Sequence, residues 1–352
     1  MHSKSDRFVI VFNGEIYNYK EIREELENKG YSFHTSGDTE VLLKGFICYK
    51  EKILDKLRGQ FAFAIYDSIE KTTFLARDRI GIKPLYFSKY KEWIVFGSEM
   101  KTIESSKLIP FIPDTESYMT YMRHLCIPGS STGNKNISKV RPGEYVTFSK
   151  SGEIKTYKYW DPFSFEIDYE MSESDASDEL ERLLIESVEY RKVSDVEVGL
   201  FLSGGLDSSL IGKLMKAGSQ SKLKGFNIDY EEHFDGYKGE VSEAEYASSN
   251  IDIELIKEKI AYRDFKTLLN NYSNYQDDLN GDEVGIPLYF LGKSARSKGI
   301  TVVQVGEGAD ELFYGYEHWL RYLKLNRFIK PIMKNSSRVS GFSNHRLNLL
   351  SN

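Results

Sequence analysis

The stretch that most constrains the fold is residues 198–209, which read Val-Gly-Leu-Phe-Leu-Ser-Gly-Gly-Leu-Asp-Ser-Ser. An apolar run that breaks into small and hydroxylated residues is typical of a buried strand entering a tight turn. A helix is predicted directly after the turn. Asp207, Ser208 and Ser209 would lie in its first turn, where their side-chain oxygens would satisfy free backbone N–H groups.

The predicted turn has the features of an anion site. Two consecutive glycines, Gly204 and Gly205, let the backbone approach a ligand closely, and a helix N-terminus offers N–H donors, so we expect phosphate there. The alternative is an ordinary strand-to-helix turn, since glycine pairs begin many helices. Asp207 would repel a bare pyrophosphate, so we infer a Mg²⁺ between the two. The stretch lacks the Gly-Lys-Ser/Thr of a Walker loop.

A second motif, residues 306–311, is rich in carboxylates. It reads Gly-Glu-Gly-Ala-Asp-Glu and follows a strand predicted over 300–305. Taken alone, such acids are more often helix caps. Strands alternating with helical stretches, including one over 223–228, predict a parallel α/β sheet, whose ligands lie beyond the carboxyl ends of the strands. That rule puts residues 203–209, Ile228 and residues 306–311 on one rim and predicts a metal-and-base site there.

The first part of the chain is predicted to be strand-rich with two early helices. Residues 7–12 are β-branched and aromatic, so a strand should deliver Asn13-Gly14-Glu15 to its end, where a plain turn is the alternative reading. Helices are predicted over 19–29 and 36–49, a strand buried on both faces over 60–67, and shorter strands over 73–76, 85–88 and 93–96.

The pattern lapses between residues 157 and 177, which predicts domains over 1–156 and 178–352 joined by a linker. A helix should begin near Ser174, with one apolar side formed by Ala176, Leu180, Leu183, Leu184 and Val188. A length of 352 residues is enough for two hydrophobic cores.

Ser-Gly-Gly-Leu-Asp-Ser-Ser resembles the pyrophosphate loop of the ATP pyrophosphatases, and with residues 306–311 the chain resembles the glutamine-hydrolysing asparagine synthetases. The resemblance implies a partial Ntn-type αββα glutaminase domain followed by a parallel-sheet α/β ATP-pyrophosphatase domain. It implies a C–N ligase that uses ATP to amidate aspartate through a β-aspartyl-adenylate, releasing AMP and pyrophosphate. Glutamine or ammonia would supply the nitrogen.

The same resemblance implies roles for individual residues. Asp207 and Asp310 would share Mg²⁺, and Glu307 would act as base beside the adenylate. Asn13 and Gly14 would form an oxyanion hole, and glutamine would be held by Asn13, Gly14, Glu15 and Asp38. Val305 stands where the family often has Ser. ATP would be bound by Leu202, Ser203, Gly204, Gly205, Leu206, Asp207, Ser208, Ile228, Val305 and Gly306.

Residues 77–86 and 98–101 also match the family closely, although taken alone their charges would be interpreted as solvated loop residues. Elsewhere the chain departs from the pattern. His2 stands where the family has its nucleophilic cysteine, and residues 276–282 lack the usual prolines. Cys48, on a predicted helix, and Cys126, beyond the core motifs, are no substitutes, so we expect no glutaminase activity. The family pattern predicts a chain truncated at both ends, without the helical remainder that carries a catalytic lysine.

Two rival functions stay open: another adenylating enzyme such as a β-lactam synthetase, and a non-catalytic fragment that binds nucleotide or a partner. A net charge of −6 gives no electrostatic case for binding nucleic acid or a membrane surface. Two cysteines without metal-ligand spacing favour a reduced, cytoplasmic setting. The expected partners are therefore small molecules, and a homodimer remains open.

Overall fold

The computed structural model describes residues 1–218, 222–231 and 239–336, with side chains up to residue 326. The chain forms two compact units. The first comprises Met1–Glu197, Ile228–Gly239 and Glu258–Gly299, and the second comprises Val198–Asn227, Glu240–Lys257 and Ile300–Asn352. Each unit is described by itself below.

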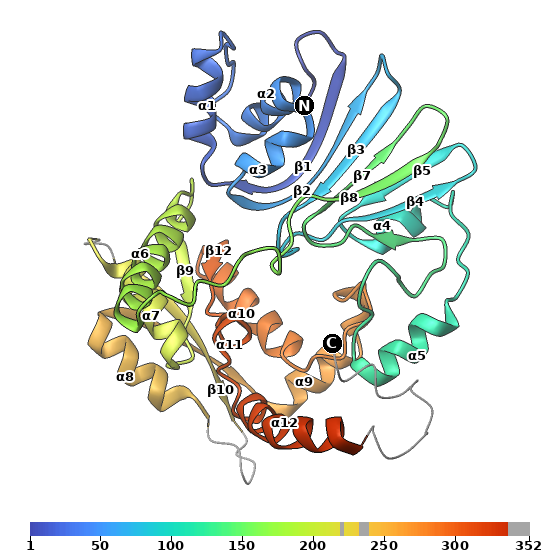
Figure 1. Ribbon diagram of the computed structural model, residues 1–352. Helices are drawn as coiled ribbons and strands as arrows, with labels where there is room; N and C mark the ends of the chain where they lie inside the picture. Colours follow the sequence, from blue (N-terminus) through green and yellow to red (C-terminus); the bar gives the residue numbers. More distant parts are fainter. Residues whose placement is uncertain (219–221, 232–238, 337–352) are drawn as a thin grey trace. The chain divides into compact units, whose positions relative to one another are not determined.

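The first unit is built on a five-stranded antiparallel sheet (Figure 1). In sheet order its strands are β1 (Phe8–Ile16), β2 (Gly59–Asp67), β3 (Thr72–Arg77), β7 (Glu144–Phe148) and β8 (Ile154–Lys158). One face is covered by α1 (Tyr19–Asn28), α2 (Asp38–Tyr49), the short 3₁₀ turn η1 (Lys50–Lys52) and α3 (Ile53–Lys56). The elements expected over 7–12, 19–29, 36–49, 60–67 and 73–76 are thereby confirmed, with shifts of a few residues.

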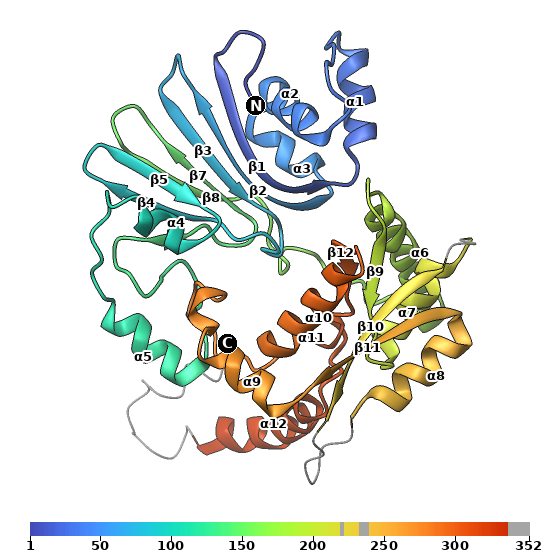
Figure 2. The ribbon, with the colours of Figure 1, turned by 180° about the vertical axis from the view of Figure 1, so that it is seen from behind.

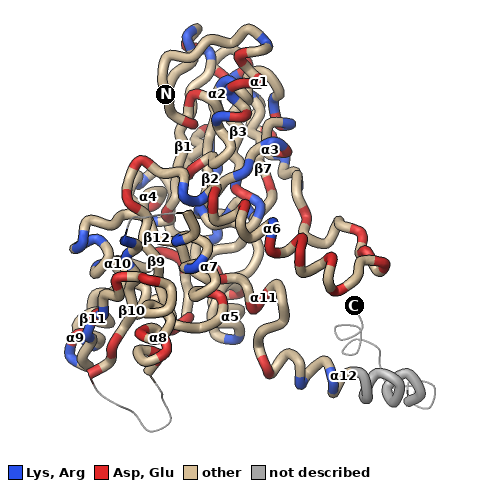
Figure 3. Tube along the Cα trace, turned by 90° about the vertical axis from the view of Figure 1, so that its left-hand side faces the viewer, with Lys and Arg blue, Asp and Glu red and all other residues tan. Residues whose placement is uncertain are grey.

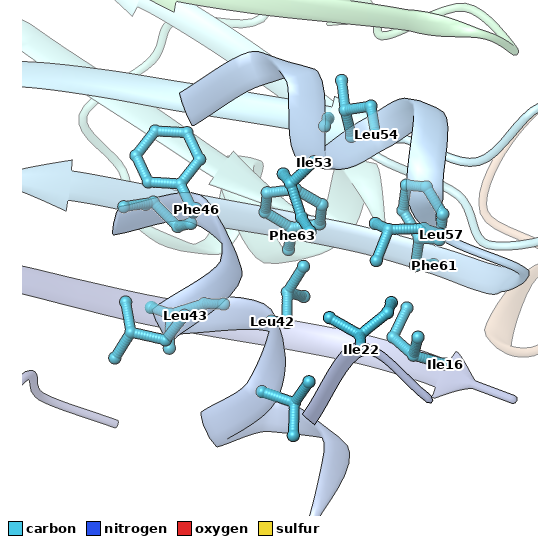
Figure 4. Packing of buried hydrophobic residues seen from close by; sticks show 14 of the residues in the cluster. Ile16, Ile22, Leu42, Leu43, Phe46, Ile53, Leu54, Leu57, Phe61 and Phe63 are labelled. Carbon is cyan, nitrogen blue, oxygen red and sulfur yellow. The ribbon is translucent and has the colours of Figure 1, made fainter. Parts of the chain in front are cut away.

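The helices and the sheet share one apolar core. Figure 4 shows Leu42 and Phe46 of α2 packing toward Phe63 of β2, and all three side chains are at least 92% buried. On the other face of β2, Ala62 and Ala64 join a second cluster that includes Leu85 and Phe87. Burial on both faces confirms that β2 lies between two layers.

The second layer is a three-stranded sheet in the order β5-β4-β6. Phe87 of β4 meets Phe148 of the first sheet edge-on, with ring centroids 5.5 Å apart. The elements of this layer are β4 (Tyr86–Tyr90), β5 (Trp93–Gly97) and β6 (Ser138–Lys139), flanked by α4 (Met100–Ser105) and α5 (Thr115–His124). The expected strands over 85–88 and 93–96 are confirmed.

The helix expected near Ser174 is α6 (Glu173–Lys192), and the Ser172 hydroxyl caps it by accepting the N–H of Asp175 at 3.1 Å. Figure 3 shows acidic residues along the segment that leads into α6. The apolar residues expected on one side of this helix are mostly exposed: Val188 is its one buried residue, and Leu183 is 47% exposed. The remaining helices of this unit are α9 (Tyr262–Leu269), η2 (Tyr272–Asn274) and α10 (Gly285–Ser297).

The second unit contains most of a four-stranded sheet with the order β11-β10-β9-β12. Its strands are β9 (Val198–Phe201), β10 (Leu223–Tyr230), β11 (Ile253–Ile260) and β12 (Val302–Gln304). Strand β9 pairs in parallel with both β10 and β12, which confirms the parallel α/β prediction. Helices α7 (Leu206–Lys216) and α8 (Val241–Ile251) lie on one face of this sheet (Figure 2). Helices α11 (Ala309–Phe313) and α12 (Glu317–Ser336) follow β12.

Candidate functional site

The turn between β9 and α7 is held in one conformation by close backbone packing. Gly204 has a φ of +86°, and a Cβ atom there would lie 2.2 Å from the carbonyl carbon of Glu243 and 2.4 Å from the nitrogen of Ala244. Only glycine fits such an approach at a positive φ. The turn therefore rests directly on the first turn of α8.

Leu202, the residue before the turn, is fixed through both of its backbone polar groups. Its N–H donates to the carbonyl of Phe226 at 2.9 Å, and its carbonyl accepts the side-chain amide of Asn227 at 2.8 Å. Asn227 is 5% exposed. Its Oδ1 atom is buried without a hydrogen-bond partner in the described part of the chain. Asn227 is not among the residues that the sequence singles out, because its one signal there is a polar residue inside an apolar strand.

The hydroxyl groups of the turn bond to one another, and Ser203 Oγ also accepts the N–H of Gly205 at 3.2 Å. Ser203 Oγ and Ser208 Oγ are 3.0 Å apart, and the Ser208 hydroxyl also donates to the carbonyl of Gly205 at 3.3 Å. Gly205 is the N-cap of α7 and no side chain caps this helix, so the expected capping by its first-turn side chains was wrong. The first N–H groups of a helix lack intrahelical acceptors, so those of α7 stay available for an anion.

The segment after β12 meets the first turn of α7. This contact was expected, because both segments follow the carboxyl ends of parallel strands. A Cβ on Gly306 would lie 3.1 Å from the nitrogen of Ser208 and 3.2 Å from the Cβ of Asp207. Burial raises the pKa of the Asp207 carboxyl, and the negative charge of Asp310 raises it further. The like charges of two such carboxyl groups repel each other, and a cation between them would relieve the repulsion.

Asp310 and its neighbours form a short, tightly packed corner. A Cβ on Gly315 would lie 1.7 Å from Asp310 Oδ1, so a glycine is needed to seat that carboxylate. Glu311 accepts the Tyr316 hydroxyl at 2.7 Å, and this hydrogen bond raises the pKa of Tyr316 to about 12. Glu307 and Val305 are exposed.

Two further predicted ATP contacts differ in their surroundings. Leu206 is 82% exposed at the start of α7. Ile228, on β10, belongs to the first unit and packs against a cluster formed by Ile260, Leu268, Ile286 and Phe290.

No group of three or more His, Cys, Asp or Glu side chains suited to a metal occurs among the described residues. The pair Asp207 and Asp310 nevertheless fits Mg²⁺, which proteins commonly bind through one or two carboxylates together with substrate phosphates. No helix in the described parts of the chain is long and apolar enough to cross a membrane.

The residues predicted to handle glutamine lie in β1 and at the start of α2. Asn13-Gly14-Glu15 was expected at a strand end, but β1 continues to Ile16, and Gly14 pairs with Phe61 of β2. Gly14 has a φ of +151°, and a Cβ there would lie 2.1 Å from the carbonyl oxygen of Gln60. The close contact between the two strands explains why the strand can continue through Asn-Gly.

Two of these side chains, those of Asn13 and Asp38, already have hydrogen-bond partners. Asn13 donates its side-chain amide to Ser98 Oγ at 3.1 Å, and Asp38 Oδ2 accepts the N–H of Ile16 at 3.0 Å. Burial raises the pKa of Glu15, and the charge of Asp38 adds to the effect. The structure therefore brings Asn13, Glu15 and Asp38 into one neighbourhood, with Ser98 as a member that the sequence did not single out.

Two charged residues of the loop over 77–83, Arg77 and Asp78, are held by hydrogen bonds rather than solvated as their charges alone suggest. Asp78 is 1% exposed and accepts the N–H groups of Phe61, Gly81, Ile82 and Lys83 at 2.7–3.2 Å. Arg77 donates to the carbonyls of Gly81, Lys83 and Val140 at 2.8–2.9 Å. This pair folds the loop over the end of β3.

Comparisons with known proteins match two families to successive parts of the sequence. A glutamine amidotransferase domain family matches residues 1–160, and the asparagine synthase family matches residues 179–351. The asparagine synthetase [glutamine-hydrolyzing] 1 of Bacillus subtilis is 39% identical over 325 residues, covering 92% of this chain and 50% of that protein.

Two further relatives bear similar names. A putative asparagine synthetase [glutamine-hydrolyzing] 2 of Methanocaldococcus jannaschii is 34% identical over 93% of this chain and 62% of its own length. A putative asparagine synthetase [glutamine-hydrolyzing] of Mycobacterium bovis is 32% identical over 95% of this chain and 52% of its own length. The chain thus spans between half and two thirds of the length of these relatives.

Proposed function

Because the chain belongs to the family of glutamine-hydrolysing asparagine synthetases, we propose that it takes part in ATP-dependent amidation of aspartate. The observation that carries the proposal is the meeting of the β9–α7 turn with Gly306 beside the pair Asp207 and Asp310. A nucleotide triphosphate with its divalent cation matches that combination of N–H donors and paired carboxylates.

In the proposed reaction, a β-carboxylate oxygen of aspartate attacks the α-phosphorus of ATP, and pyrophosphate leaves. Ammonia then attacks the acyl carbon of the adenylate, AMP leaves, and the nitrogen gives up a proton. Mg²⁺ would neutralise phosphate charge between Asp207 and Asp310. The free N–H groups of α7 would hold the departing pyrophosphate, and the exposed Glu307 would accept the proton.

We assign the glutamine-facing role to the neighbourhood of Asn13, Gly14, Glu15 and Asp38. An amide side chain beside a backbone N–H can stabilise an oxyanion. Neither cysteine of the sequence suits the nucleophile: Cys48 lies ten residues beyond Asp38 on α2, about 15 Å along a helix, and Cys126 is exposed after α5. We therefore propose that this chain uses free ammonia.

The setting is proposed to be a reducing cytoplasm, supported by two free cysteines. The substrates are proposed to be small molecules: ATP, aspartate, and ammonia or glutamine.

Formation of AMP from Mg-ATP and ammonium, with and without aspartate, tests the proposal. Asp207→Asn should abolish aspartate-dependent AMP. Asp252→Asn is the matched control, because Asp252 lies in the same unit, forms a surface ion pair with Lys216 and is 84% exposed. AMP formation that does not depend on aspartate, or that is retained in Asp207→Asn, would contradict the assignment.

A further inference from the structure

The segment 276–282, from the asparagine synthase half of the sequence, contacts residues of the amidotransferase half within the first unit. Two consecutive aspartates make the polar contacts. Asp277 accepts the N–H of Lys101 at 3.0 Å and also the N–H of Met100, the first two residues of α4. A carboxylate at the N-terminus of a helix satisfies donors that the helix itself leaves open.

Asp278 is bound by two different side chains. Its Oδ2 accepts the Tyr86 hydroxyl at 3.2 Å and the Lys139 ammonium at 2.9 Å. Only 11% of the Lys139 side chain and 22% of the Asp278 side chain are exposed. Burial raises the pKa of Tyr86 and the charge of Asp278 raises it further, which keeps the hydroxyl protonated as a donor. Exposed ion pairs contribute little to the free energy of folding, but partly buried charge-assisted hydrogen bonds contribute more.

Backbone contacts continue along the segment. The Gly281 N–H donates to the carbonyl of Leu125 at 2.6 Å, and Asn280 forms an antiparallel bridge with Cys126. A proline at position 281 would have no N–H to give, so the lack of prolines in this stretch is compatible with the contact. Lys139 also donates to the carbonyl of Ile127 at 2.6 Å, which ties the chain that follows Cys126 to the same ammonium.

We propose that Tyr86, Met100, Lys101, Leu125 and Lys139 form a docking surface, here called the clamp, whose occupant is the acidic segment 276–282 of the same chain. The segment leads within three residues into α10, where Ile286 and Phe290 are buried. The clamp therefore fixes the start of α10 from the amidotransferase half. No enzymatic activity is needed for this contact, so it can be tested separately from the proposed reaction.

Hydrogen–deuterium exchange on the full chain tests the clamp. The variants are Lys139→Met, Asp278→Asn and the double variant, with Lys155→Met as control, since Lys155 is exposed on β8. Each single variant should speed exchange of the 279–289 amides by about tenfold, the effect of losing one charge-assisted hydrogen bond on local opening. The double variant should speed exchange by less than the product of the two single effects, because both substitutions break the same Asp278–Lys139 bond.

Unchanged exchange at 279–289 in both singles, or effects that multiply in the double variant, would overturn the proposal. Faster exchange in β2 would instead mean that the variant has lost the fold. Tyr86→Phe tests the clamp even if the charge variants lose the fold, because it removes one hydroxyl and keeps the buried ring. It should speed exchange at 279–289 by a few-fold without changing β2, and no change there would also count against the clamp.

Discussion

The side-chain amide of Asn227 donates to the carbonyl of Leu202 at 2.8 Å, so a buried asparagine on β10 fixes the residue that precedes the β9–α7 turn. Asn227→Asp replaces the N–H donor with a carboxylate oxygen that faces the carbonyl and adds negative charge beside the loop. We expect Mg-ATP affinity to fall by about ten- to a hundred-fold, since breaking a buried hydrogen bond costs about 1–3 kcal/mol. Titration calorimetry measures the Mg-ATP affinity of the variant and of the wild type.

Asn250→Asp is the matched control for that substitution, because Asn250 is an exposed asparagine of α8 whose amide bonds to the carbonyl of Tyr246. It adds the same charge in the same unit without touching the loop. Equal weakening in both variants would mean that charge alone, and not the contact with Leu202, causes the loss.

Gly204→Ala should disturb the β9–α7 turn far more than Gly218→Ala does. Both glycines have a positive φ, but a Cβ at Gly204 would lie 2.2 Å from the backbone of α8, whereas nothing lies within 4 Å of one at Gly218. We expect about 1 kcal/mol for the positive φ in both and a further 1–3 kcal/mol or so from overlap at Gly204 alone. Thermal unfolding and ATP binding of the two variants measure the difference, and matching losses would refute the role of the backbone contact.

Asp207→Asn should weaken binding of Mg-ATP much more than binding of magnesium-free ATP. The remaining Asp310 would hold the cation alone, while metal-free ATP loses a repulsive carboxylate. Calorimetric titrations with magnesium and with a chelator present give the two affinities. A loss of equal size under both conditions would show that Asp207 holds no metal.

Asp67 should stabilise the first unit in a pH-dependent way. Hydrogen bonding to Arg7 lowers the pKa of Asp67 to about 2, and the two side chains meet at 2.7 Å. A carboxyl with a depressed folded-state pKa stabilises fully above its unfolded value of about 4, and the contribution disappears as the pH falls toward 2. The melting temperatures of wild type and Asp67→Asn should therefore differ at pH 6 and converge near pH 2. A gap that is the same at both pH values would contradict this.

Glutamine should not be hydrolysed through either cysteine. Cys126 is exposed and should react quickly with a thiol reagent, whereas the partly buried Cys48 should react slowly. We expect no glutamate release above a protein-free blank and no change in ammonium-dependent AMP formation after Cys126 is blocked. Glutamate release that disappears in Cys48→Ala or Cys126→Ala would prove the prediction wrong.

Local patterns predicted much of this fold because the information is local. The strand, glycine turn and helix over 198–216 follow from neighbouring residues, and β2 could be recognised because its apolar residues face both sides. The meeting of Gly306 with Asp207 followed from a general rule for parallel sheets.

Other features depend on partners distant in sequence, which local patterns do not contain. Asp78 looks like a solvated charge until the four N–H groups around it are known. The sequence predicts a strand end at Asn13. The strand continues instead, and the contact that accommodates Gly14 there comes from Gln60, which is distant in sequence. The apolar side of α6 follows the helical period, yet burial depends on what lies against it, and Val188 alone is covered.

Strand β8 closes the five-stranded sheet with a free edge, and all five of its residues are exposed. Such an edge invites a strand from another molecule, and lysines are a common protection against that. Lys155 and Lys158 lie on β8, so two copies meeting edge to edge would bring like charges together along the new ladder. The edge should therefore resist fibril growth at neutral pH and lose that resistance when its lysines are acetylated.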